Sequence, residues 1–112
     1  MSALFIMRYA GTGRKTAGAL YWGDGIIIGV DDGGAKYDGN FCEIEGRMQG
    51  AMTINVPSGC ETLVTGRRVR GPASVDLTFD FPADFDNGQP NIMAIVGGAV
   101  VRATFERIKT VQ

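Results

Sequence analysis

The sequence predicts an all-β fold, in which about eight short antiparallel strands form a meander that closes as a barrel or a highly curved sandwich. Two observations predict it. Apolar and polar residues alternate with a period of two in several segments, and turn residues separate these segments at intervals of about 8–12 residues. No eleven-residue window has the i, i+3, i+4, i+7 apolar spacing of an amphipathic helix. A single β-barrel domain over residues 1–112, with little or no helix, is therefore expected.

The alternation is clearest in residues 75–81, where every odd position is apolar and every even position is polar. Successive side chains of a strand point to opposite faces, so this segment is expected to have one buried and one solvated face. In chain order, the expected strands are residues 3–9, 16–22, 26–30, 36–41, 48–56, 61–65, 75–81 and 99–106.

Turn residues lie between these segments. Asp24-Gly25 and Glu45-Gly46 are suited to tight hairpin turns, because such turns need positive φ angles. Residues 82–90 form a longer break between two prolines. Glycines within strands permit the bends that close a small barrel, and four are placed there: Gly18, Gly29, Gly39 and Gly50.

Composition argues against several classes of function. The formal net charge is −1, whereas nucleic-acid binding and membrane-surface binding both favour a basic surface. The chain has no histidine, the commonest general base and zinc ligand. Residues 11–16 lack the Gly-Lys step of a phosphate loop, and residues 84–88 lack the distal glutamate of a calcium loop. The sequence therefore predicts no enzyme, no catalytic residue, no metal and no cofactor.

The cysteines and the N-terminal residues indicate in which cellular compartment the protein is expected. No signal peptide and no membrane-spanning helix is expected, because the first apolar run stops at Arg8. Cys42 and Cys60 lie eighteen residues apart without a CxxC pair, and we expect both thiols to be reduced. A cytoplasmic location is expected.

Residues 18–39 carry a resemblance to a known family. Residues 18–25 (GALYWGDG) look like a glycine-led strand that ends in a hairpin, residues 28–31 (IGVD) resemble a Gly-Gly-Asp segment, and residues 37–39 (YDG) are similar to a Tyr-x-Gly strand start. This order resembles the GrlR-type negative regulators of type III secretion. The clear part covers about a quarter of the chain.

The resemblance implies a small bacterial cytoplasmic protein with a lipocalin-like β-barrel, usually dimeric, that represses secretion genes by binding a transcriptional activator. That family uses four consecutive acidic residues just after the Tyr-x-Gly strand. In the matching stretch here only Glu43 and Glu45 are acidic, and Ile44 separates them. Glu43 and Glu45 are the first candidates for partner binding. The only basic cluster, Arg67, Arg68 and Arg70, is the second.

Two functions remain open from the residues. The first is a regulatory or interaction protein that binds another cytoplasmic protein. The alternative is a carrier of an apolar small molecule or lipid inside the barrel, since a barrel of eight strands is either filled by side chains or holds one small ligand. A homodimer is expected, because the uncharged stretch of residues 91–96 would leave aliphatic side chains exposed on an edge strand.

Overall fold

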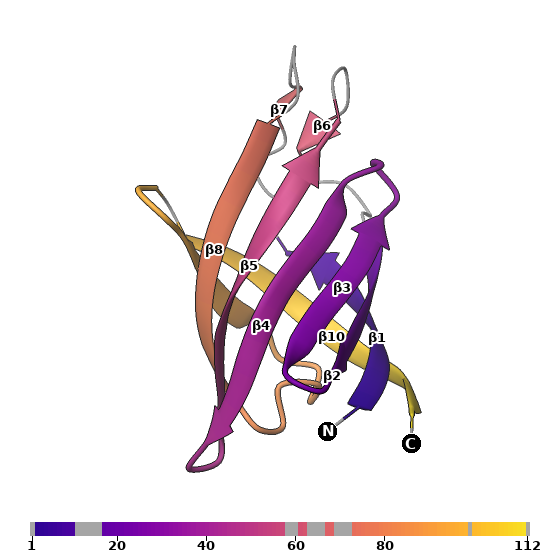
Figure 1. Ribbon diagram of the computed structural model, residues 1–112, viewed down its shortest axis with the longest axis vertical. Helices are drawn as coiled ribbons and strands as arrows, with labels where there is room; N and C mark the ends of the chain where they lie inside the picture. Colours follow the sequence, from indigo (N-terminus) through magenta and orange to yellow (C-terminus); the bar gives the residue numbers. More distant parts are fainter. Residues whose placement is uncertain are drawn as a thin grey trace.

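Eight antiparallel strands curve into a closed barrel in the computed structural model (Figure 1). The structure describes residues 2–10, 17–57, 61–62, 67–68, 73–98 and 100–111. The barrel strands are β1 (Ser2–Tyr9), β2 (Ala17–Gly23), β3 (Ile26–Asp31), β4 (Lys36–Ile44), β5 (Arg47–Val56), β8 (Ala73–Pro82), β9 (Asn91–Ile95) and β10 (Val100–Thr110). The predicted all-β antiparallel barrel is thus confirmed, and the described residues contain no helix.

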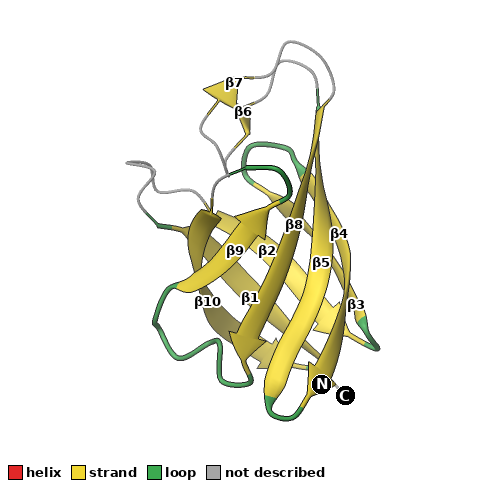
Figure 2. Ribbon diagram, turned by 90° about the vertical axis from the view of Figure 1, so that its left-hand side faces the viewer, coloured by secondary structure: helices red, strands yellow, loops and turns green. Residues whose placement is uncertain are grey.

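Each barrel strand pairs with the next along the chain, and β10 pairs with β1 to close the ring. Two further short strands, β6 (Glu61–Thr62) and β7 (Arg67–Arg68), pair with each other outside the barrel. Figure 2 shows this ribbon beyond one end of the barrel, while both chain termini lie near the other end. We call these the ribbon end and the terminal end.

The predicted hairpins form where the sequence placed them. Asp24 and Gly25 join β2 to β3 with φ angles of 53° and 77°, and Glu45 and Gly46 join β4 to β5 with 51° and 77°. Two successive positive φ values match the right-handed twist of the flanking strands.

One predicted strand lies outside the barrel. Of residues 61–65, the structure describes Glu61–Thr62, which form strand β6 and pair with β7, and residues 63–65 lie outside the described residues. The eighth barrel strand is instead β9, which pairs with β8 and with β10. Its side chains alternate, with Asn91 and Met93 buried and Ile92 and Ala94 exposed. The apolar composition of residues 91–96 obscured this alternation, because Ile92 and Ala94 are apolar yet face outward.

Candidate interaction surface

The terminal half of the barrel is filled by aromatic rings. The Trp22 ring centroid lies 4.8 Å from that of Phe85 and 5.3 Å from those of Phe41 and Phe79. Seven buried aromatic side chains form this cluster: Phe5, Trp22, Phe41, Phe79, Phe81, Phe85 and Phe105. Among the described residues, Trp22 Nε1 is the one buried side-chain polar atom without a hydrogen-bond partner, and aromatic rings of the cluster surround this indole.

The loop after β8 closes the terminal end. Phe85 leaves this loop and enters the barrel, where its side chain is completely buried. Asn91 Nδ2 holds it there by donating to the Phe85 carbonyl at 2.8 Å. Arg107 Nε donates to Asp86 of the same loop at 2.9 Å, and its guanidinium lies 5.3 Å from the Phe5 ring centroid. The rings therefore occupy the space in which an apolar ligand would lie at this end.

A buried polar chain lies toward the ribbon end, where β1 and β3 finish and β4 begins. Tyr37 donates from its hydroxyl to Asp31 Oδ2 at 2.8 Å, and the Tyr9 and Tyr37 hydroxyl oxygens are 2.6 Å apart. Because the Tyr37 proton points to the carboxylate, Tyr9 is the donor in the second bond. Asp31 Oδ1 also accepts from the backbone N–H groups of Gly33 and Ala35.

These hydrogen bonds stabilise the fold at the ribbon end of the barrel. Burial raises the pKa of the Tyr9 hydroxyl and, still more, the pKa of the Tyr37 hydroxyl, so both are protonated at neutral pH. Through these hydrogen bonds, Asp31 connects the β3–β4 turn to the two tyrosines. The tyrosines therefore provide neither a base nor a nucleophile at neutral pH.

The outer surface of β1, β2 and β3 carries a contiguous group of apolar side chains, which we call the apolar face. Leu4 lies opposite Tyr21, which lies opposite Ile28, so these three side chains form one row across the sheet. The exposed fractions of Ile26, Ile28 and Val30 are 43 %, 49 % and 55 %. The apolar face consists of the outward side chains Leu4, Ile6, Ala19, Tyr21, Ile26, Ile28 and Val30.

Sequence reasoning missed this surface, although a signal existed. The run Ile26-Ile27-Ile28 is apolar at both parities of a strand. In a barrel only one parity can face the core, so the other must be exposed. Contiguous exposed apolar side chains on a folded domain typically mark a contact with another molecule.

Both glutamates predicted to bind a partner lie at the β4–β5 hairpin, at the terminal end (Figure 1). Glu43 is in β4 opposite Met48, Glu45 is the first turn residue, and both are exposed. The strand alternation ends at Ile44, so strand parity does not determine the direction of Glu45. The structure brings the two into one exposed tip with Ile44, whose exposed fraction is 49 %.

The second predicted site, the basic cluster of Arg67, Arg68 and Arg70, lies largely outside the described residues. Arg67 and Arg68 form strand β7 and pair with β6. Their side chains, and the whole of Arg70, lie outside the described residues. Residues 11–16 and Cys60 also lie outside them, whereas Cys42 is exposed as a free thiol.

The expected edge strand is wrong, because β9 is paired on both sides within a closed barrel. The expected exposed aliphatic side chains are present, since Ile92 and Val96 are 52 % and 65 % exposed. They are separate from the apolar face, because β10 lies between β9 and β1.

No group of three or more histidine, cysteine or acidic side chains able to hold a metal ion occurs among the described residues. No helix long and apolar enough to cross a membrane occurs among them either.

No model of a known protein family matches this chain, and no match was found among curated proteins or solved structures.

Proposed function

We propose that this protein is a non-enzymatic, dimeric interaction protein, comparable in role to the GrlR-type negative regulators that it resembles between residues 18 and 39. In this proposal two lipocalin-like barrels pair through their apolar faces in the bacterial cytoplasm. The opposite side of each barrel then binds another protein, with a transcriptional activator as the expected class of partner.

The apolar face is the observation that carries this proposal. It places seven apolar side chains on three paired strands, outside a barrel whose terminal half is filled by its own rings. A carrier needs an apolar interior, and an enzyme needs converging reactive groups, but neither needs an apolar exterior. Protein association does, because burial of such side chains drives it.

A second copy suits the apolar face because a two-fold axis applies the same surface to itself. The outward residues of β2 and β3 carry no charge, so face-to-face packing about Ile28 would bury no ionised group of these strands. Pairing there leaves the β4–β5 hairpin and the outer surface of β8 free, because the barrel order places β4, β5 and β8 beyond β3.

Native mass spectrometry after gentle purification tests the proposal against the carrier alternative. We expect the mass of two chains with no retained small molecule. A stoichiometric lipid or other apolar molecule would overturn the proposal in favour of a carrier. In parallel, affinity capture from the native host is expected to recover one protein whose retention is lost when Glu43 and Glu45 are both replaced by lysine.

A further inference from the structure

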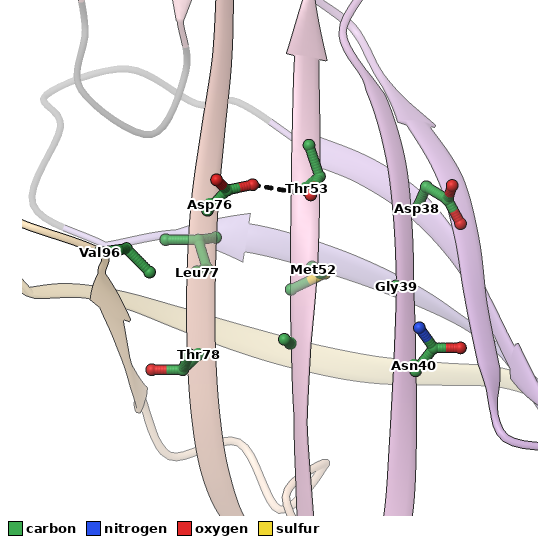
Figure 3. Close-up of a pocket in the computed structure, with 10 residues that line it drawn as sticks. Asp38, Gly39, Asn40, Met52, Thr53, Asp76, Leu77, Thr78 and Val96 are labelled. Atoms are coloured by element: carbon green, nitrogen blue, oxygen red, sulfur yellow. Dashed lines mark hydrogen bonds between the residues drawn. The ribbon is translucent and has the colours of Figure 1, made fainter.

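A polar groove of about 270 Å³ crosses the outer surface of β4, β5 and β8. Figure 3 shows Asp38 and Asn40 on β4 at one side, Asp76 and Thr78 on β8 at the other, and Thr53 between them on β5. We call this surface the polar groove. Its β8 side lies on the surface that the proposed dimer leaves free, whereas Asp38 on its β4 side lies opposite Ile28 and borders the apolar face.

The register explains why the surface is concave at this place. Ala51 lies directly between Asn40 on one neighbouring strand and Thr78 on the other. Its methyl group is shorter than either flanking side chain, so the sheet surface dips there. In the next row, Thr53 lies between Asp38 and Asp76 in the same way.

The groove carries two negative charges. Asp38 and Asp76 are both exposed and lie two strand spacings apart, about 10 Å between their Cα atoms. Neither forms an ion pair with a basic side chain of the described residues. The Thr53 hydroxyl donates to Asp76 Oδ1 at 2.8 Å, which orients the carboxylate and leaves Oδ2 to accept from another donor.

Two cations of the described residues share this sheet face. Lys36 is exposed on β4, two residues before Asp38, whereas Arg47 is engaged by Asp80. Arg47 Nε donates to Asp80 Oδ1 at 2.6 Å, and its Nη2 donates to the Asp80 carbonyl. The two groove carboxylates are also not part of a metal-binding group among the described residues. Two carboxylates favour a cation in the groove, and a guanidinium needs fewer converging protein ligands than a metal ion.

We propose that the polar groove receives an arginine side chain of the partner protein, and this inference rests on the proposed function. A guanidinium presents five N–H donors in a planar fork, which suits two carboxylates and the neighbouring Asn40 and Thr78 oxygens better than a compact ammonium. The exposed Val96 side chain also lines the groove and offers apolar surface to the methylene stem.

Titration of the ¹⁵N-labelled protein with the peptide acetyl-Gly-Ala-Arg-Ala-Arg-Ala-Gly-amide tests this inference directly. We expect saturable amide shifts centred on Ala51, Thr53 and Thr78, with a dissociation constant below about 1 mM at low salt. We also expect weaker binding as salt increases. A peptide with glutamate in place of arginine is expected to leave these amides unmoved.

The variant Asp38→Asn with Asp76→Asn is expected to weaken peptide binding at least about tenfold. Its matched control is Asp24→Asn with Asp32→Asn, which removes the same charge from two exposed turn positions outside the groove. The control is expected to change binding less than about twofold. Equal weakening in both variants, or shifts spread over all acidic turns, would overturn the groove as a site.

In a third variant, a long side chain introduced at position 51 fills the groove. Ala51→Arg places a guanidinium between the strands that carry Asp38 and Asp76, and it is expected to block the peptide. Peptide binding that survives in this variant would contradict the proposal.

Failure of this inference is distinguishable from failure of the proposed function. If the protein is dimeric and captures a partner, but the groove variants neither bind peptide differently nor lose the partner, the groove proposal alone fails. If native mass spectrometry shows a lipid-loaded monomer, the proposed function fails whatever the peptide titration shows.

Discussion

Tyr37 is the residue on which the ribbon-end polar chain depends, because it both donates to Asp31 and accepts from Tyr9. Tyr37→Phe would leave Asp31 with only its two backbone donors and Tyr9 without its acceptor. Loss of buried hydrogen bonds that leaves polar groups unpaired costs about 1–3 kcal/mol. We expect this loss in the free energy of unfolding at pH 8, measured by urea titration. Ser74→Ala, which removes an exposed hydroxyl on β8, is the control, and an equal effect there would contradict the role of Tyr37.

The same tyrosines predict a pH dependence. Burial raises the pKa of both hydroxyls in the folded state above the unfolded value of about 10. Their contribution is therefore complete below pH 10 and is lost as the pH rises above it, because only the unfolded chain ionises. Two such groups lower the unfolding free energy by about 2.7 kcal/mol per pH unit above pH 10. Tyr9→Phe and Tyr37→Phe are each expected to reduce this slope, and an unchanged slope would contradict the assignment.

Phe79 and Asp80 test the register of β8 at single-residue scale. Phe79 is buried against Trp22 and Phe81, so Phe79→Ala is expected to cost about 3–5 kcal/mol. The sequence predicts a change within about 0.5 kcal/mol for the outward Asp80→Ala. The structure adds an exposed ion pair with Arg47, which raises the expected cost to at most about 1 kcal/mol. Equal shifts of the two denaturation midpoints would contradict the register.

At the scale of strands, the paired backbones of β4 and β5 leave no space for a side chain at two glycines. A Cβ atom on Gly39 would lie 2.4 Å from the Ala51 carbonyl oxygen, and one on Gly50 would lie 2.1 Å from the Asn40 carbonyl oxygen. Both neighbours are backbone atoms, so a methyl group there requires the strands to move apart. Gly39→Ala and Gly50→Ala are expected to destabilise by about 1–3 kcal/mol.

Gly98→Ala is the matched control for these glycines. Its Cβ would meet the Ile95 side chain at 3.3 Å, and the half-buried Ile95 can adjust. We expect a change within about 0.5 kcal/mol in chemical denaturation. If all three alanine variants unfold at the same denaturant concentration, the close pairing of β4 and β5 does not require glycine at positions 39 and 50.

The β4–β5 hairpin carries the sequence-based binding prediction. Both Glu43 and Glu45 are exposed, so their joint replacement by lysine is expected to leave the melting temperature nearly unchanged. Affinity for a captured partner is expected to fall at least tenfold, about 1.4 kcal/mol, because the reversed charge repels a basic partner surface. Calorimetric titration measures this. Unaltered affinity would move the site elsewhere, with Arg67, Arg68 and Arg70 next to be tested.

At the scale of the whole molecule, a homodimer follows from where the apolar side chains lie. Light scattering at micromolar concentration is expected to give the mass of two chains. Ile28→Asp places a charge at the centre of the apolar face and is expected to raise the dimer dissociation constant at least about tenfold. Ser74→Asp, exposed on β8, is the control. If Ile92→Asp dissociates the dimer and Ile28→Asp does not, the interface lies at residues 91–96, as predicted from the sequence.

The sequence by itself determined the local structure of this chain. The alternation in residues 75–81 established which side chains of β8 face the core at Leu77, Phe79 and Phe81, and the Asp-Gly and Glu-Gly pairs located two hairpins. These features depend on neighbours within a few residues, because side-chain parity and turn angles are properties of a short segment.

Tertiary structure alone decided the rest. Phe85 enters the core from a loop, β9 completes the ring, and Tyr9 reaches Tyr37 across 28 positions of the chain. The polar groove and the apolar face likewise exist only once strand pairing aligns Asp38 with Asp76 and Leu4 with Ile28. Each depends on which strands become neighbours when the barrel closes, and the pattern of a single strand does not contain that information.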